Sequence, residues 1–385
     1  NMKKGLIYLL LLVLGTATFS SCEDDDNDGY KRISSEYKNA TLKLTFNGKE
    51  LNDKTVEIQA LNETTANLIL KSLIPGESNL YLNALLANTG GDNYTLEAKS
   101  ETTDRTVVVE GGVTEGVLTL NCTFKVTSKV VGNWKFIAQQ ETSTDPEQLI
   151  GKGPLHLKIV TDIDSIKLPI VLPDGSNWSF AIKDNMETED AGFVSFAKVM
   201  FSLLVPNLLY NIELQEDGDL TATYAVMDET MNPTDTVTLP EGVVRYNVKD
   251  GEIYIAVDIN ALLPRSDADQ PSVDVLKMLA EGLPLILKLD GDNNMTVYVD
   301  KDMMVPFMGM VDLVKGLVKD MEPMDVLIGT ITAESLQKFL DDVVILVNTS
   351  ETIELGLNLE TNTHPEMKPQ PQAFSWEKAL LPFRK

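Results

Sequence analysis

The stretch NIELQEDGDLTATYAV, residues 211–226, shows the pattern that decides the fold of this chain. Apolar and polar residues alternate on both sides of Asp217 and Gly218, which is typical of two antiparallel strands joined by a tight turn. The same strand–turn–strand unit recurs at residues 244–257 and again at residues 285–299. We therefore expect these three hairpins to lie in one antiparallel sheet with meander connections.

Segments with helical periodicity lie around these hairpins. Their apolar residues recur at i, i+3 and i+4, as in helices that cover a sheet. Residues 132–385 are therefore predicted to form an α+β domain, in which a curved antiparallel sheet packs several amphipathic helices. Pro206, Pro284 and Pro306 interrupt three of these segments, so we expect each of the three to consist of two shorter helices. The expected helical segments are residues 190–210, 272–287, 303–321 and 333–347.

Residues 36–131 have a different, all-β pattern. Apolar residues alternate with polar ones in TLKLTFNGKEL, residues 41–51, around an Asn-Gly hairpin turn. The dipeptides Pro75-Gly76 and Gly111-Gly112 predict further turns between short strands. Because no helical stretch interrupts these strands, the region is predicted to be an antiparallel β-sandwich or an open barrel.

The N-terminus has the features of a lipoprotein signal. Lys3 and Lys4 precede an apolar run at residues 6–14, which is shorter than the ~20 residues of a membrane-spanning helix. Small residues then precede Cys22 and resemble a bacterial lipobox. That resemblance implies that residues 1–21 are removed and that Cys22 carries a lipid, which anchors the chain to a membrane. The alternative is an ordinary secretory signal with an incidental cysteine.

An acidic run directly follows this cysteine and consists of Glu23, Asp24, Asp25 and Asp26. Such a run stays hydrated and does not pack, so residues 22–35 are predicted to form a flexible tether. The run resembles the export tag of surface lipoproteins of the Bacteroidetes. This resemblance implies an outer-membrane protein exposed on the cell surface, with the periplasmic face as the alternative.

The signal, the tag and the strand patterns together resemble a family of outer-membrane lipoproteins of gut Bacteroidetes, some of which have calycin-like β-barrel halves. The resemblance implies an exported, membrane-anchored protein rich in β-structure. It transfers no catalytic or binding residue to this sequence. The strand patterns that carry it are residues 39–51, 116–126, 132–136 and 218–226.

Composition limits the classes of partner. The chain has 385 residues, more than one ordinary domain, and a formal net charge of −26. A surface this acidic repels phosphate backbones, so we do not expect nucleic acid as a partner. Hydrophobic residues make up 43% of the chain but aromatic ones only 6%, which predicts a large and mainly aliphatic core.

The sequence offers few residues for catalysis or metal binding. His156 and His364 are its two histidines, and Cys122 is its second cysteine. A zinc site needs three or four nitrogen or sulfur ligands, and a catalytic triad needs a histidine beside an exposed serine. The sequence contains neither a nucleophile elbow nor a zinc-protease helix nor a phosphate-binding loop. We therefore expect no catalytic residue, no metal and no cofactor, and we expect a buried, inert Cys122.

Two ligand classes stay open from the sequence. Asp162 and Asp164 are a carboxylate pair of the kind that glycoside hydrolysis uses, although a solvated strand face is the simpler interpretation. Trp134, Trp178 and Trp376 are candidates for stacking on a glycan, but packing in the core or at the domain junction is favoured for the first two. The methionine- and leucine-rich helices either line a cavity for an apolar ligand or simply fill the core.

The sequence therefore favours a non-enzymatic lipoprotein that binds a ligand or a protein partner at the outer membrane. The alternatives are a structural or assembly component of a cell-surface complex and, less favoured, a glycan-processing enzyme with a carboxylate pair. A binding protein predicts a concave pocket with convergent polar groups, whereas an assembly component predicts an exposed apolar patch. An enzyme predicts a carboxyl group in a cleft whose pKa is raised by burial.

Overall fold

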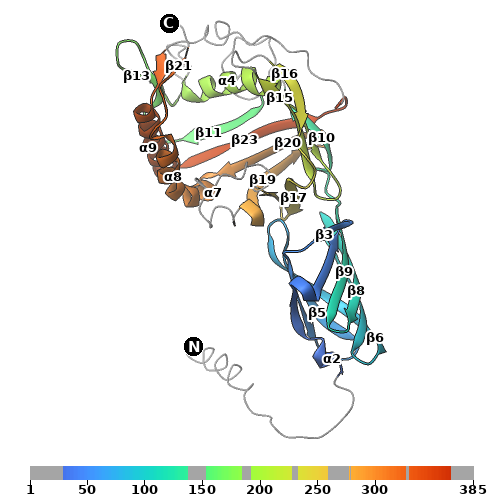
Figure 1. Ribbon diagram of the computed structural model, residues 1–385. Coiled ribbons are helices and arrows are strands. Elements are labelled where there is room, and N and C mark those ends of the chain that lie inside the picture. Colours follow the sequence, from blue (N-terminus) through green and yellow to red (C-terminus); the bar gives the residue numbers. More distant parts are fainter. Residues whose placement is uncertain are drawn as a thin grey trace, which may run out of the picture.

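The computed structural model describes residues 29–137, 153–183, 192–227, 233–258, 277, 279–326 and 329–365. The chain is mostly β-structure: two curled antiparallel sheets form half-barrels, and helices accompany the second one (Figure 1). This architecture confirms the fold class that the alternating pattern predicts. Cys22, the acidic run Glu23–Asp26 and Trp376 lie outside the described residues.

The N-terminal half-barrel is one nine-stranded sheet with the order β1-β4-β5-β6-β7-β8-β9-β2-β3. Because the sheet is continuous, the region is an open, curled sheet and not a sandwich of two sheets. Strands β2 and β9 pair in parallel, with Leu42 opposite Leu118. The strands are β1 (Ser35–Lys38), β2 (Leu42–Phe46), β3 (Lys49–Leu51), β4 (Thr55–Ala60), β5 (Thr65–Ile74), β6 (Glu77–Gly90), β7 (Asn93–Glu101), β8 (Arg105–Thr114) and β9 (Val117–Val126), with the single turn η1 (Asn39–Thr41) before β2.

Alternation of residue types explains the inner face of this sheet. In β9 the side chains of Leu118, Leu120, Cys122 and Phe124 are buried, and those between them are exposed, because successive side chains of a strand point to opposite faces. Burial raises the pKa of the Cys122 thiol to about 12. Cys122 is therefore the buried, inert thiol that the strand pattern predicts.

The dipeptide Gly111-Gly112 does not form the turn that the sequence predicts. Both glycines lie inside the continuous strand β8, and the turn follows at Glu115-Gly116. A Cβ atom on Gly111 would lie 2.0 Å from the carbonyl oxygen of Thr119 in β9, and one on Gly112 would lie 2.2 Å from that of Tyr94 in β7. The glycines therefore allow the neighbouring strands to approach β8 closely where the sheet curls.

The fold begins earlier than the predicted end of the tether at residue 35. The helix α2 (Gly29–Arg32) precedes Ile33, whose side chain is buried in the core of the half-barrel. The hydroxyl of Tyr37 donates a hydrogen bond to the carbonyl oxygen of Ile33, at 2.8 Å. Residues 29–35 therefore belong to the folded domain, because Ile33 is buried there. The segment available as a tether is shorter than predicted.

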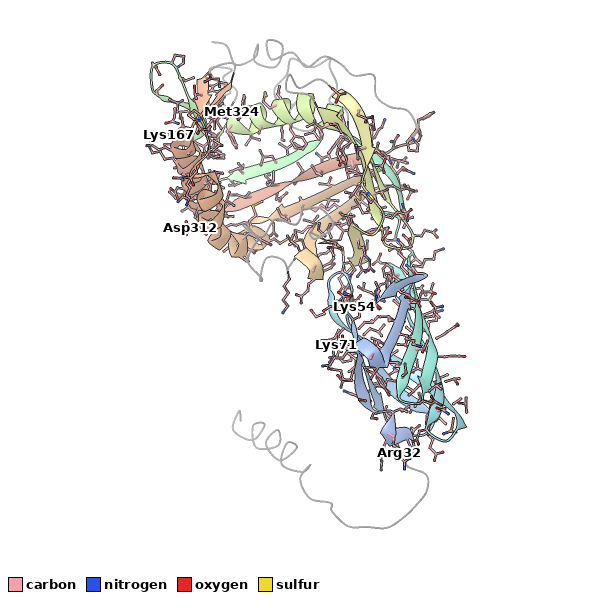
Figure 2. The ribbon with its side chains drawn as sticks, viewed as in Figure 1. Arg32, Lys54, Lys71, Lys167, Asp312 and Met324 are labelled. Carbon is pink, nitrogen blue, oxygen red and sulfur yellow. The ribbon has the colours of Figure 1, made fainter. Side chains whose placement is uncertain are left out.

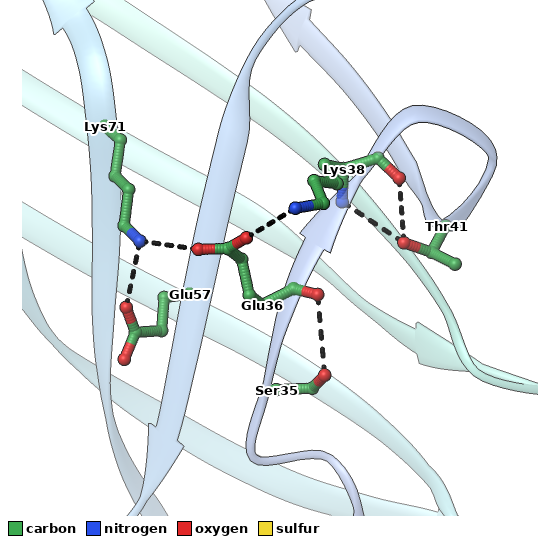
Figure 3. A network of polar contacts seen from close by, with 6 residues as sticks. All are labelled: Ser35, Glu36, Lys38, Thr41, Glu57 and Lys71. Carbon is green, nitrogen blue, oxygen red and sulfur yellow. Dashed lines mark hydrogen bonds and ion pairs between the residues drawn. The ribbon is translucent and has the colours of Figure 1, made fainter.

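An ion-pair network centred on Lys71 links the edge strand β1 to its neighbours (Figure 3). Glu36 pairs with Lys38 at 3.0 Å and with Lys71 at 2.8 Å, and Lys71 also pairs with Glu57 at 3.2 Å. The hydrogen bonds from Lys71 and then Lys38 lower the pKa of Glu36 to about 2. This exposed network connects β1, β4 and β5 on the outer face of the sheet.

The C-terminal half-barrel is a ten-stranded sheet with the order β16-β15-β14-β10-β23-β20-β19-β18-β17, and β11 pairs with β23. The three hairpins of the sequence, β14–β15, β17–β18 and β19–β20, all belong to it, as predicted. Its strands are β10 (Gly132–Phe136), β11 (Leu155–Val160), β14 (Leu209–Leu214), β15 (Leu220–Met227), β16 (Pro233–Thr238), β17 (Val244–Lys249), β18 (Glu252–Val257), β19 (Leu283–Asp290), β20 (Asn294–Asp300) and β23 (Thr352–Thr361).

The connectivity of this sheet is only partly a meander. Strands β14 to β16 and strands β17 to β20 each follow one another in space as in sequence. Strands β10 and β23, which are the first and last of the sheet along the chain, pair with each other at its centre and join the two meanders. The hairpin repeats predict the two halves but contain no signal for this central closure.

The helices agree with the sequence pattern except near two prolines. Pro206 does not divide α4 (Phe193–Leu208), whereas Pro306 lies at the start of the 3-10 helix η2 (Val305–Met310), between α7 (Lys301–Met304) and α8 (Val311–Val318). The helix expected at residues 272–287 ends before Leu283. Pro284 lies in β19, because the following residues pair with β18 on one side and β20 on the other.

A small third sheet packs beneath the last helix. Helix α9 (Ala333–Thr349) begins at a capping box, in which the Thr332 hydroxyl accepts a hydrogen bond from the Ser335 backbone N–H. The sheet has the order β13-β12-β22-β21, which the sequence pattern does not predict as a separate unit. Its strands are β12 (Ser165–Val171), β13 (Asn177–Ala181), β21 (Met324–Val326) and β22 (Gly329–Ile331).

Candidate functional site

The two half-barrels meet where turns of one insert into the other. In the β5–β6 turn the backbone N–H of Gly76 donates to the carbonyl oxygen of Glu281 at 2.7 Å, and the Asn247 amide donates to that of Pro75 at 3.1 Å. A Cβ atom on Gly76 would lie 2.3 Å from the ring of Tyr254, and the φ of Gly76 is +78°. Only glycine fits this turn into the C-terminal half-barrel.

A second pair of turns meets beside the first. The Asn47 amide donates to the carbonyl oxygen of Asp217 at 2.9 Å, and its side-chain oxygen accepts a hydrogen bond from the Phe124 backbone N–H at 2.8 Å. The Lys49 ammonium pairs with the buried carboxylate of Asp219 at 3.1 Å. The sequence predicts both turns, and the structure shows that they contact each other across the junction.

A buried ion pair stands behind the first of these turns. Arg105 on β8 donates from Nε and Nη2 to the two carboxylate oxygens of Glu77 on β6, at 2.8 and 2.9 Å. The Asn247 amide from β17 also reaches Glu77, at 3.4 Å. All three side chains are buried. The two-point geometry and the burial make this pair a fixed part of the junction.

A pocket of about 370 Å³ opens between the two half-barrels at this junction. One wall comes from the N-terminal half-barrel, from the segment around Lys54 and from the turn between β5 and β6. The other wall comes from the beginning of β17, the end of β18 and residues 280–281. Figure 2 shows Lys54 at this junction, at the end of the half-barrel opposite to Arg32. The volume lies at the lower end of the range for small-molecule sites, ~300–1,000 Å³.

Arg245 is the most distinctive residue of the pocket wall. Its guanidinium lies over the ring of Phe46, with 4.4 Å from Cζ to the ring centroid. Its Nη2 is buried and has no hydrogen-bond partner in the described part of the chain. Burial lowers the pKa of Arg245, although the nearby carboxylates of Asp219 and Asp217 act in the opposite direction. A buried cationic donor without a partner is costly, and such groups concentrate at functional sites.

The pocket wall contains charges of both signs. Its acidic residues are Asp53, Glu77, Asp258 and Glu281, and its basic residues are Lys54 and Arg245. Glu77 is neutralised by Arg105, and Glu281 lies 3.8 Å from Lys277. Neither basic residue of the wall forms an ion pair with a carboxylate among the residues described. The pocket therefore offers two cationic groups whose charge is not taken up by an ion pair.

The two histidines that the sequence singles out lie far from this pocket. His156 on β11 contacts Glu354 on β23, with 2.7 Å between Nε2 and Oε2, and its ring packs 4.9 Å from that of Tyr298. His364 is exposed and hydrogen-bonds to the Thr363 hydroxyl at 2.9 Å. No group of three or more potential metal ligands occurs within the residues that the structure describes.

The other candidates from the sequence are distributed between core and surface. Trp134 is buried at the junction, where its ring N–H donates to the carbonyl oxygen of Val130 at 2.7 Å. Trp178 is half-buried and packs against Phe180, with 4.8 Å between ring centroids. Asp162 and Asp164 are exposed, but they lie in the loop between β11 and β12 and not on one strand as predicted.

The apolar face of the C-terminal half-barrel is partly uncovered by the described residues. Helix α4 packs on this face through Phe201, whose ring meets that of Phe136 edge-on at 6.0 Å. Helix α9 and η2 cover another part, around Ile353. Leu289 and Leu355 belong to the same face by strand alternation, yet they are 38% and 45% exposed. This uncovered strip, from Leu289 beside Met295 to Leu355 beside Val299, is a second surface of interest.

Comparisons with protein-family models, with curated proteins and with solved structures return no match to this chain. None of the helices within the described residues has the length and apolar character that crossing a bilayer requires.

The residues of the pocket carry little signal in the sequence. Arg245 and Asn247 alternate with apolar residues in β17, which reads as the solvated face of an ordinary hairpin. Their burial results from the contact between the two half-barrels, which local periodicity does not encode. The one usable signal is Pro75-Gly76, which predicts the turn that forms part of the pocket wall.

Proposed function

We propose that this chain is a non-enzymatic, lipid-anchored protein of a bacterial outer membrane that binds a small polar molecule between its two half-barrels. The observation that supports this proposal is the pocket at the junction, whose walls come from both domains and include Arg245, whose buried Nη2 has no hydrogen-bond partner in the described residues. Sites between domains are common places for ligands, because two surfaces there enclose one small volume.

Binding without catalysis is the simpler interpretation of this pocket. The residues that the structure describes in its wall include no histidine, cysteine or tyrosine. The buried carboxylate of Glu77 accepts two hydrogen bonds from Arg105 and is therefore held in place as a structural group. A carboxylate that is held by an arginine in this way is better suited to ligand recognition than to proton transfer.

The position of the N-terminus supports a role away from the membrane surface. Helix α2 lies at the end of the N-terminal half-barrel that is remote from the C-terminal half-barrel (Figure 1). An anchor at Cys22 would therefore place the first domain as a spacer between the lipid and the pocket. The acidic run Glu23–Asp26 would act as the export tag and hydrated tether next to the membrane.

The proposal is tested by native mass spectrometry of the full chain, purified in detergent from its own cell envelope. Ser78 lines the pocket and is exposed, whereas the adjacent Asn79 is exposed outside it. We expect the wild type and Asn79→Trp to retain a small bound mass, and Ser78→Trp, which fills the pocket, to lose it. A spectrum that is the same for both tryptophan variants would contradict binding in this pocket.

A second candidate function is the binding of an apolar molecule on the uncovered strip around Leu289 and Leu355. The exposure of two leucines in the interior of a sheet favours it. In the same experiment, a retained mass that organic solvent extracts and that Ser78→Trp leaves in place would favour this candidate over the junction pocket.

A further inference from the structure

We infer that the junction pocket selects a small organic molecule with one carboxylate group, and that Arg245 is the residue that binds this carboxylate. The inference rests on the proposed binding function and adds the chemical class of the ligand. It is argued from the charge, the geometry and the surroundings of the pocket wall.

The first step is the state of the Arg245 guanidinium. Arg245 lines the pocket, its guanidinium rests on the ring of Phe46, and its buried Nη2 has no hydrogen-bond partner in the described residues. Its nearest buried carboxylate, Asp219, is engaged by Lys49 at 3.1 Å. A flat cation held against an aromatic ring keeps its donors fixed in one plane. A carboxylate can accept two parallel hydrogen bonds from such a plane.

The second step is the charge around this group. Lys54 adds a second basic side chain to the wall, so a negative group finds two cations there. Acidic side chains such as Asp53 also line the pocket, and they oppose a ligand with a higher negative charge. The wall therefore fits a single negative charge better than a phosphate dianion.

The third step concerns the rest of the ligand. Leu51, Leu73 and Val243 present apolar carbon to the pocket, and Ser72 and Ser78 are hydroxyl-bearing residues of its wall. Such a mixture suits a compact organic molecule with both carbon and hydroxyl groups. Hydroxy acids, sugar acids and amino acids share this chemistry, and they differ from their neutral counterparts only in the carboxylate.

The test is calorimetric titration of the full chain in detergent with matched pairs of compounds. The pairs are lactate with lactamide, glucuronate with glucose, and N-acetyl-L-alanine with N-acetyl-L-alaninamide. We expect at least one carboxylate to bind about tenfold or more tightly than its neutral partner, since charge-assisted hydrogen bonds contribute that much. That preference should disappear in Arg245→Gln and weaken in Arg245→Lys, which keeps the charge but not the planar fork.

Circular dichroism and the melting temperature show whether both variants retain the fold. If Arg245→Gln does not fold, the test uses Arg245→Lys alone. Equal binding of carboxylate and neutral partners, lost in Ser78→Trp, would overturn the inference while the proposed function stands. Binding that Arg245→Lys leaves unchanged would overturn it too. So would the failure of every carboxylate to bind at concentrations up to ~10 mM. A Ser78→Trp variant that retains all bound mass would instead count against the proposed function.

Discussion

At the scale of single residues, the junction depends on the buried pair Glu77–Arg105. Replacement of Arg105 by methionine leaves the Glu77 carboxylate buried without its main partner, since only Asn247 still reaches it. We expect a loss of about 3–5 kcal/mol in the free energy of unfolding, as for other buried pairs that lose one member. Urea denaturation of the wild type and of Arg105→Met measures this loss.

The double variant Glu77→Gln with Arg105→Met is the matched control. It removes both charges, so we expect it to recover a large part of the stability that the single variant loses. A double variant that is less stable than Arg105→Met would show that the two residues act independently and would contradict this account of the junction.

The exposed network around Glu36 predicts a dependence of stability on pH. The lysines hold the pKa of Glu36 at about 2 in the folded chain, below the ~4.3 of an unperturbed glutamate. The stabilisation is therefore fully present above the unfolded value and is lost as the pH falls through the range from about 4.3 to 2. The melting temperatures of wild type and Glu36→Gln should differ at pH 7 and converge at pH 2.

Salt provides the control for this prediction. Because the network is exposed, 1 M sodium chloride should reduce the difference between wild type and Glu36→Gln at pH 7. A difference that changes neither with salt nor with pH would mean that the charge of Glu36 does not contribute to the attachment of β1.

At the scale of elements, strand β8 depends on its two central glycines. In Gly111→Ala the new methyl group would meet the Thr119 backbone at 2.0 Å, so β8 and β9 must separate or twist. We expect a loss of about 1–3 kcal/mol, the usual cost of overpacking. Gly316→Ala is the contrasting variant, because no atom lies within 4 Å of its Cβ position in α8, and helix propensity there favours alanine by about 1 kcal/mol.

Thermal denaturation of the two alanine variants measures both effects. Gly111→Ala should lower the melting temperature and Gly316→Ala should raise it or leave it unchanged. Equal melting temperatures would show that the close approach of the strands around β8 is relaxed without cost.

The same element shows how much of the fold the sequence predicts. The alternation of apolar and polar residues predicts the buried face of β9 and all three hairpins of the C-terminal sheet. Burial of one strand face and a tight turn both leave local signals in the sequence. Gly111-Gly112 has the composition of a turn. Its actual role, which is to let β7 and β9 approach β8 closely, depends on the position of those two strands. Pro284 likewise reads as the end of a helix until its pairing partners are known.

At the scale of the whole molecule, the parts that local patterns do not predict are those where the two half-barrels meet. Asn247 and Arg245 each occupy a polar position of the alternating strand β17, and each is buried or half-buried at the contact with the other domain. The sequence therefore predicts the fold class, but it does not predict the pocket. The pocket exists because two domains with their own patterns are held in one orientation.

That orientation leads to a prediction about Gly76. Gly76 and Gly116 both have a φ of +78°, so alanine at either position carries the same left-handed backbone strain of about 1–2 kcal/mol. Only at Gly76 does the added methyl group meet the other domain, at 2.3 Å from the Tyr254 ring. Gly76→Ala should therefore lower the melting temperature more than Gly116→Ala does, and it alone should loosen the junction.

Spin labels on cysteines at Thr103 and Asp312, which are exposed on the two different domains, report the looseness as a distribution of distances. The native thiol of Cys122 does not interfere, because it is buried and its pKa is raised to about 12. The distribution should broaden in Gly76→Ala and stay narrow in Gly116→Ala. Equal distributions in both variants would mean that the β5–β6 turn does not fix the domains. In that case the other contacts across the junction, such as those of Asn47 and Lys49, would set the geometry of the pocket.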